Sequence, residues 1–164
     1  MVLKAPTHDE LAPEAGFTEV FAPVRGGVGR SFVSGEPSGD RLRVRYGYLA
    51  TDRLLRGRCW FGPGAEGPPS HAHGGSMAAL LDEAMGTCAW ASGHGVVAAR
   101  IEVEFRTLLP LGRVVVVESQ VSRVEGRKVH VTGRITDGSA TRYATSTGLF
   151  LELGAERFAG LVGP

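Results

Sequence analysis

Long apolar runs, an excess of charge of one sign and cysteine are all scarce in this sequence. No stretch approaches the roughly 18 consecutive apolar residues of a membrane-spanning helix. The formal net charge is only +1, which argues against a broad surface for nucleic acid or anionic membrane. The first ten residues lack a signal-peptide core, and the two cysteines, Cys59 and Cys88, stand in unrelated contexts. We therefore expect reduced thiols in a cytoplasmic protein.

What is present fits one globular domain. The chain has 164 residues, of which 43% are apolar and 21% charged, enough for a single sizeable core. Proline and glycine interrupt residues 1–40, which predicts an irregular N-terminal arm with one short helical turn near 9–15. The domain itself is predicted over residues 41–153, and residues 154–164 are predicted to form a loose C-terminal tail.

From residue 40 onward, apolar and polar residues alternate with the period of two that is typical of β-strands. Leu42, Val44 and Tyr46 alternate with arginines, which predicts a half-buried strand with a cationic outer face. Asp137-Gly138 marks a hairpin turn. Five further strands are predicted over residues 54–61, 98–106, 113–124, 128–136 and 142–153.

One helix is predicted, over residues 76–90. Gly74 and Gly75 indicate a tight turn before it, and from Ser76 onward good helix formers make a segment that is apolar nearly all round. Such a helix is typically buried, yet this one carries Asp82 and Glu83, which are costly to bury ionised without partners.

The order of these elements indicates the fold. No helices alternate with the later strands, which excludes a doubly wound parallel sheet. A sheet of five or six strands must bury one face, and the 76–90 helix is the long apolar segment available to cover it. We predict an α+β hot-dog fold, in which a strongly curved antiparallel sheet wraps around one central helix.

The start of this helix and its first acid form the candidate site. Free N–H groups and the positive end of the helix dipole favour an oxyanion, and glycine lets a substrate approach closely. An acid in apolar surroundings tends to a raised pKa, which suits proton transfer near neutral pH. Gly75 and Asp82 share one face but lie roughly 10 Å apart along the axis, so both could hardly contact one carbonyl. The spacing therefore predicts a dimer of antiparallel copies.

The stretch from His73 to Asp82, His-Gly-Gly-Ser-Met-Ala-Ala-Leu-Leu-Asp, resembles the motif of hot-dog thioesterases of the PaaI type. In that family an Asp stands nine residues after the His of His-Gly-Gly. The flanks agree, because proline and glycine precede the motif and Pro110-Leu-Gly112 stands before a valine-rich strand. The likeness extends over roughly residues 42–151.

The resemblance implies hydrolysis of acyl-CoA by a homodimer or dimer of dimers, a homotetramer, with its active site at the subunit interface. It implies an oxyanion contact from the Gly74 and Gly75 amides and Asp82 as general base or nucleophile. No metal or organic cofactor is implied. Two positions depart from the family pattern: Gly67, where some members carry Asn or Gln, and Ala98, where many carry Ser or Thr.

Other candidate residues could have a structural role instead of a functional one. His73 is interpreted as bracing the turn rather than carrying a proton, and with His71 it lacks a convincing third ligand for zinc. Glu83 points about 100° away from Asp82 and is interpreted as structural or as a subunit contact. The candidate substrate contacts are His71, Ser76, Met77, Glu83, Ala98 and Arg106, the arginine through CoA phosphates.

Two other functions stay open at this point. A hot-dog enoyl-CoA hydratase or dehydratase would need an Asp/His pair placed differently from this motif. A non-catalytic acyl-CoA-binding module would keep the sheet and pocket without hydrolysis, and the missing polar side chains at positions 67 and 98 favour it.

Overall fold

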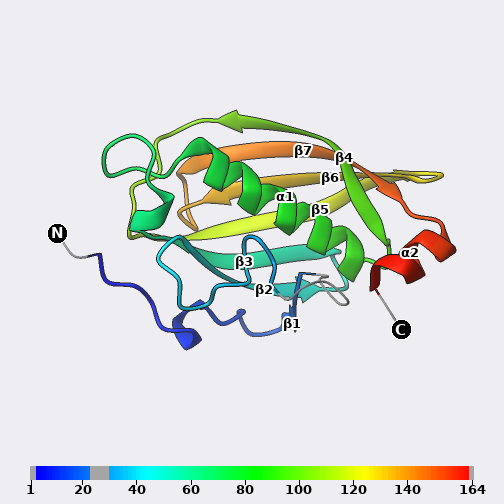
Figure 1. Cartoon of the computed structure of the whole chain (residues 1–164), viewed down its shortest axis with the longest axis horizontal. Helices are drawn as coiled ribbons and strands as arrows, with labels where there is room; N and C mark the ends of the chain where they lie inside the picture. The colour runs from blue at the N-terminus through cyan, green and yellow to red at the C-terminus, as the bar shows by residue number, and fades with distance from the viewer. Residues whose placement is uncertain (1–2, 23–29, 163–164) are drawn as a thin grey trace.

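A computed structural model describes residues 3–22 and 30–162, and it shows a curved antiparallel sheet wrapped around one long helix (Figure 1). The strand order in the sheet is β1-β2-β3-β5-β6-β7-β4. The strands are β1 (Thr18–Val20), β2 (Leu42–Leu49), β3 (Leu54–Phe61), β4 (Val96–Phe105), β5 (Val114–Glu125), β6 (Lys128–Thr136) and β7 (Arg142–Glu152). The helices are α1 (Gly74–Ala91), α2 (Ala155–Val162) and the short 3-10 turns η1 (Asp9–Leu11) and η2 (Pro63–Ala65).

The α+β hot-dog prediction is confirmed, with one strand more than expected. All six predicted strands are present, and β1 is a seventh that pairs with β2 from within the predicted arm. Three residues are too few to show a period of two, so β1 has no strand signal in the sequence. The predicted tail likewise contains the helix α2. Residues 1–2 and 23–29 of the predicted arm lie outside the described residues.

The arm packs across the outer face of β2 and β3. Arg43 donates to the carbonyl of Pro6 at 2.9 Å, and Arg45 donates to the carbonyl of His8 at 3.0 Å. Arg45 also forms an ion pair with Glu19 of β1 at 2.7 Å. The predicted alternation along β2 is confirmed, but its outward arginines bind the arm instead of facing only solvent.

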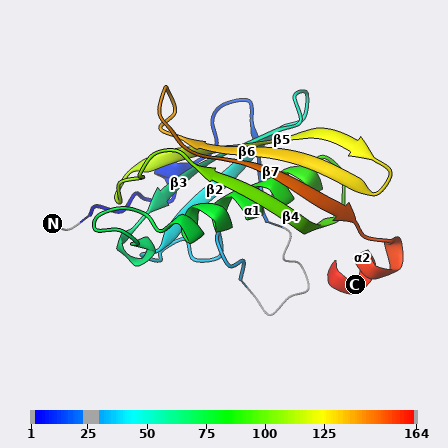
Figure 2. The same cartoon turned by 90° about the horizontal axis from the view of Figure 1, so that it is seen from above.

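The helix α1 lies against the inner face of the sheet (Figure 2). Leu81 and Met85 are fully buried there. Gly133 and Gly148 on the facing strands leave room for them. A Cβ at position 148 would lie 2.5 Å from the Phe150 ring and 3.1 Å from the Met85 sulfur. Among the described residues, no helix is long and apolar enough to cross a membrane.

This close packing gives a first prediction. Replacing Gly148 with Ala is expected to lower the free energy of unfolding by about 1–3 kcal/mol, because Phe150 and Met85 must move to admit the added methyl group. The matched control is Gly154→Ala, where an added Cβ meets nothing within 4 Å. Urea unfolding of both variants is the measurement. Equal stability of the two would contradict the close contact.

Candidate active site

The start of α1 is organised by His73. This residue is the N-cap of the helix, and its Nδ1 accepts a hydrogen bond from the Gly75 amide at 2.9 Å. Because Nδ1 is the acceptor, the ring proton of the neutral imidazole is on Nε2. The Ser76 hydroxyl donates to the His73 carbonyl at 2.7 Å. Gly74 and Gly75, predicted as a turn before the helix, are instead its first two residues, because a side-chain cap stabilises the helix at that point.

The backbone around His73 is held by neighbouring loops. The His73 amide donates to the carbonyl of Ala65 in η2, and the Ala72 amide donates to the carbonyl of Leu109, both at 2.8 Å. The Nδ1 of His71 lies 2.8 Å from the carbonyl of Pro69. The approach to the helix is therefore fixed on both sides, and His71 is engaged in its own loop.

The two candidate oxyanion donors differ in their availability. The Gly75 amide is already bonded to His73, whereas no described residue accepts a hydrogen bond from the Gly74 amide. Gly74 also lies beside the end of β4, where a Cβ would come within 3.2 Å of the Phe105 ring. Among the residues that the structure describes, Gly74 is thus the free backbone donor at the positive end of the helix.

Asp82 lies two turns further along α1. Its side chain is half-buried, and no described group donates a hydrogen bond to it. Burial first, and then the negative charge of Glu83, raise the pKa of its carboxyl above the usual value. Ala78 and Gly86, one turn to either side on the same face of the helix, are both small. These surroundings suit a group that exchanges a proton.

Glu83 has a different environment. Its carboxylate accepts hydrogen bonds from the Tyr46 hydroxyl at 2.9 Å, from the Ser34 amide at 3.4 Å and from the Ser31 hydroxyl. Both of its oxygens are therefore used within the chain. These bonds support a structural role for Glu83 over a contact with substrate.

The remaining predicted residues are divided between the two ends of α1. Met77 is buried near the helix start, and Arg106 is exposed beside it in an ion pair with Glu104. Ala98 pairs with Phe150 near the start of β4, at the opposite end of the helix from Gly74. One chain alone does not bring Ala98 to the helix start. Among the described residues, no three His, Cys, Asp or Glu side chains gather as a metal site.

Two hollows flank the start of α1. One, of about 250 Å³, is lined by Gly74, Met77, Phe105 and Leu108 among others. The other, of about 230 Å³, is lined by Phe32 together with His73, Gly75 and Ser76. Sequence reasoning missed the two phenylalanines, because they lie far from the motif in the chain and only the fold brings them to it.

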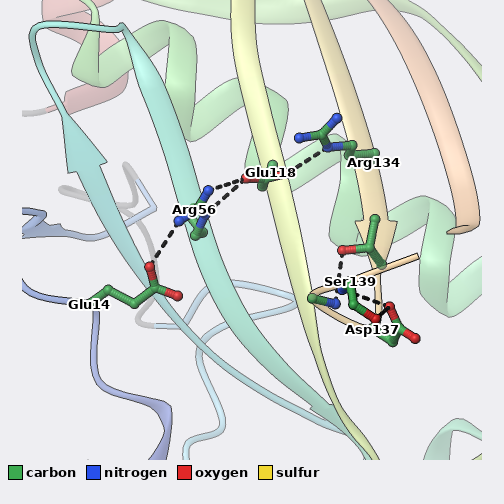
Figure 3. A network of polar contacts seen from close by, with 8 residues as sticks. Glu14, Arg56, Glu118, Arg134, Asp137 and Ser139 are labelled. Carbon is green, nitrogen blue, oxygen red and sulfur yellow. Dashed lines mark hydrogen bonds and ion pairs between the residues drawn. The ribbon is translucent and has the colours of Figure 1, made fainter. Parts of the chain in front are cut away.

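A separate polar network lies on the outer face of the sheet, away from these hollows (Figure 3). The buried Glu118 is bonded by Arg134 at 2.5 Å and by Arg56 at 2.7 Å, and Arg56 reaches Glu14 of the arm at 2.9 Å. Although burial opposes it, these two arginines lower the pKa of Glu118. The network ties the arm to the centre of the sheet.

Comparison with known proteins finds a family model that matches part of the chain. A sequence model described as the thioesterase superfamily matches residues 70–144, from the loop before α1 into β7. This segment, just under half of the chain, is similar to the thioesterase superfamily. The resemblance carried by the His73–Asp82 motif is thereby confirmed.

Named relatives extend this thioesterase assignment. Acyl-coenzyme A thioesterase THEM5 of Mus musculus is 38% identical over 102 residues, which are 60% of this chain and 41% of the relative. Acyl-coenzyme A thioesterase THEM4 of Bos taurus is 35% identical over 121 residues, which are 72% of this chain and 50% of the relative. The chain thus spans at most about half the length of these relatives.

Solved structures agree with the thioesterase fold. A thioesterase superfamily protein superposes with a TM-score of 0.64 at 27% identity, covering 67% of this chain and 54% of the other. The E. coli PaaI protein gives 0.59 at 16% identity, covering 63% and 75%. A hypothetical thioesterase from Streptococcus pneumoniae, solved with coenzyme A, gives 0.60 at 16% identity, covering 63% and 80%. The last two likenesses show the fold alone.

The cap at the helix start gives a second prediction. His73→Ala removes the acceptor for the Gly75 amide and is expected to cost about 1 kcal/mol of unfolding free energy. His73→Asn supplies a new side-chain acceptor and is expected to restore most of the loss. Urea unfolding tests the cap. An Asn variant with native stability but lost turnover would instead make His73 a proton carrier.

Proposed function

We propose that this chain hydrolyses acyl-CoA thioesters to the free acid and CoA. The observation that carries the proposal is the pair of groups on α1. The Gly74 amide at the helix start donates to no described residue, and Asp82, two turns later, is a half-buried acid with a raised pKa. The thioesterase family assignment and the names of the THEM4 and THEM5 relatives support the same reaction. The buried, unpaired cysteines favour a reducing compartment such as the cytoplasm.

In the proposed reaction the Gly74 amide, with the helix dipole, stabilises the negative charge that develops on the thioester oxygen. Asp82 as general base takes a proton from water while the water oxygen bonds to the carbonyl carbon. The carbon–sulfur bond then breaks, and the proton passes to the departing thiolate, which gives the acid and the CoA thiol. Asp82 as nucleophile would instead form an anhydride that water then hydrolyses.

The geometry favours a dimer for this chemistry. Gly74 and Asp82 lie on one continuous helix, roughly 12 Å apart along its axis, so a single copy does not place both at one carbonyl. The strand β4 is ten residues long, forms one edge of the sheet and exposes Val97 and Phe105 at its ends. A long unpaired edge strand of this kind is a template for pairing with another strand.

We propose that two β4 strands pair antiparallel about a two-fold axis, in a homodimer or in a dimer of dimers. Such pairing continues the sheet and sets the two α1 helices side by side in opposite directions. The Asp82 of one copy then faces the Gly74 amide of the other. Ala98 of one copy also comes closer to the helix start of its partner.

Substitution of Asp82 tests the chemistry. Asp82→Asn and Asp82→Ala are expected to lower kcat by roughly 10²–10⁴-fold, the usual contribution of a general base. Thiol release from short, medium, long and aromatic acyl-CoAs is the measurement, with the exposed Asp52→Asn as the control for charge removal. Near-native turnover in both Asp82 variants would eliminate this mechanism. Tight acyl-CoA binding by the native chain without thiol release would favour the binding module.

Asp82 also predicts a pH dependence. The pKa of Asp82 is raised in the folded chain, so its ionised form is disfavoured there. The free energy of unfolding therefore falls as pH rises from the ordinary pKa of 3.8 through the raised pKa. Asp82→Asn should therefore gain stability relative to the native chain over that interval while losing activity. The acidic limb of native kcat should lie above an ordinary aspartate pKa.

The proposed dimer gives a further prediction. Val97→Lys places a charge on the β4 edge and is expected to convert the dimer to monomer and to abolish most turnover. Val124→Lys is the matched control, because Val124 is similarly exposed, at 41% against 44%, but lies near the β5–β6 hairpin. Sedimentation analysis and thiol release are measured on the same samples. A fully active monomer would rule out the shared site.

A further inference from the structure

The residues just before β2 make a turn that is anchored against α1. Val33 is buried in the core at 4% exposure. On either side of it, the Ser31 hydroxyl and the Ser34 amide donate hydrogen bonds to Glu83. Glu83 is itself held by Tyr46 of β2. The segment 31–35, which we call the anchored turn, is therefore fixed to the helix that carries Asp82.

Phe32 precedes Val33 in this turn and has the opposite environment. It is 80% exposed, although the turn that carries it is held in place by its neighbours. Aromatic and apolar side chains are the usual lining of small-molecule pockets, and Phe32 borders such a hollow. The hollow in question is the one of about 230 Å³ that also contains His73, Gly75 and Ser76.

The lining of this hollow is mainly apolar. Arg41 and Glu66 also border it, and their opposite charges balance, so it does not favour the phosphates of CoA. Its volume lies below the usual range for drug-sized ligands. Besides Phe32, its apolar side chains come from Leu42, Ala65 and Ala79.

We propose that this hollow is the acyl subsite and that Phe32 limits the length of the acyl chain it admits. The inference rests on the proposed thioester hydrolysis. With the carbonyl at the helix start, one hollow lies on each side of it. The hollow with Phe32 takes an aliphatic acyl group of short to medium length, and the hollow beside Phe105 takes the thiol side. The anchored turn thus makes the N-terminal arm a determinant of specificity.

Two opposite substitutions test the subsite. Phe32→Ala opens the wall and is expected to raise the ratio of kcat/KM for lauroyl-CoA over butyryl-CoA by about tenfold, mainly through KM. Ala79→Leu fills the hollow from the helix side and is expected to lower the same ratio. The control is Phe21→Ala, an equally exposed phenylalanine of the arm at 77% that does not line the hollow. Its ratio should equal that of the native chain.

The outcomes separate this inference from the proposed function. Native turnover with ratios unchanged in both subsite variants would overturn the acyl subsite and leave the hydrolysis standing. Absence of turnover in the native chain would contradict the proposed function. In that case the same ratio is measured as Kd for non-hydrolysable thioether analogues of the two acyl-CoAs. If the ratio of the two Kd values is the same in both variants as in the native chain, the acyl subsite is also overturned.

Discussion

The burial of α1 against the inner face of the sheet is the constraint on which the rest of the structure depends. It is possible because Gly133 and Gly148 let Leu81 and Met85 sit close to the strands. A helix fixed in this way has a fixed start, so its amide dipoles are aimed before any ligand arrives. Preorganised donors are what stabilise developing charge most effectively, since they need no reorganisation during the reaction.

Asp82 and Glu83 are neighbours on α1 but have different surroundings. Adjacent residues on a helix point about 100° apart, so they meet different surroundings. Glu83 meets three donors and holds the anchored turn, whereas Asp82 meets no described donor and keeps a carboxylate of raised pKa. The satisfied acid serves the fold and also adds to the pKa of its neighbour through its charge. Asp82, which lacks a described donor, is the acid whose ionised form is destabilised by burial, and perturbed acids of this kind are common at functional sites.

The fold and the position of the motif could be predicted from the sequence because their signals are local. Alternation over 54–61 and 128–136 matches β3 and β6 without error at either end. The helix began two residues earlier than predicted, because the His73 cap is an interaction that propensity does not include. The strand β1 and the arm packing on Arg43 could not be predicted, since both depend on contacts between distant segments.

The candidate site shows the same limit more sharply. The motif identifies Asp82 and the glycines, but it contains no information about Phe32 or Phe105. Phe32 comes before the motif in the sequence and Phe105 after it, and each lines one of the two hollows at the helix start. Chemistry in such a fold is therefore encoded in a short local stretch, while the shape of the pocket is set by segments that share no pattern with it. If the hollow beside Phe32 is the acyl subsite that we propose, a change in the arm alone would alter the acyl preference and leave the motif untouched.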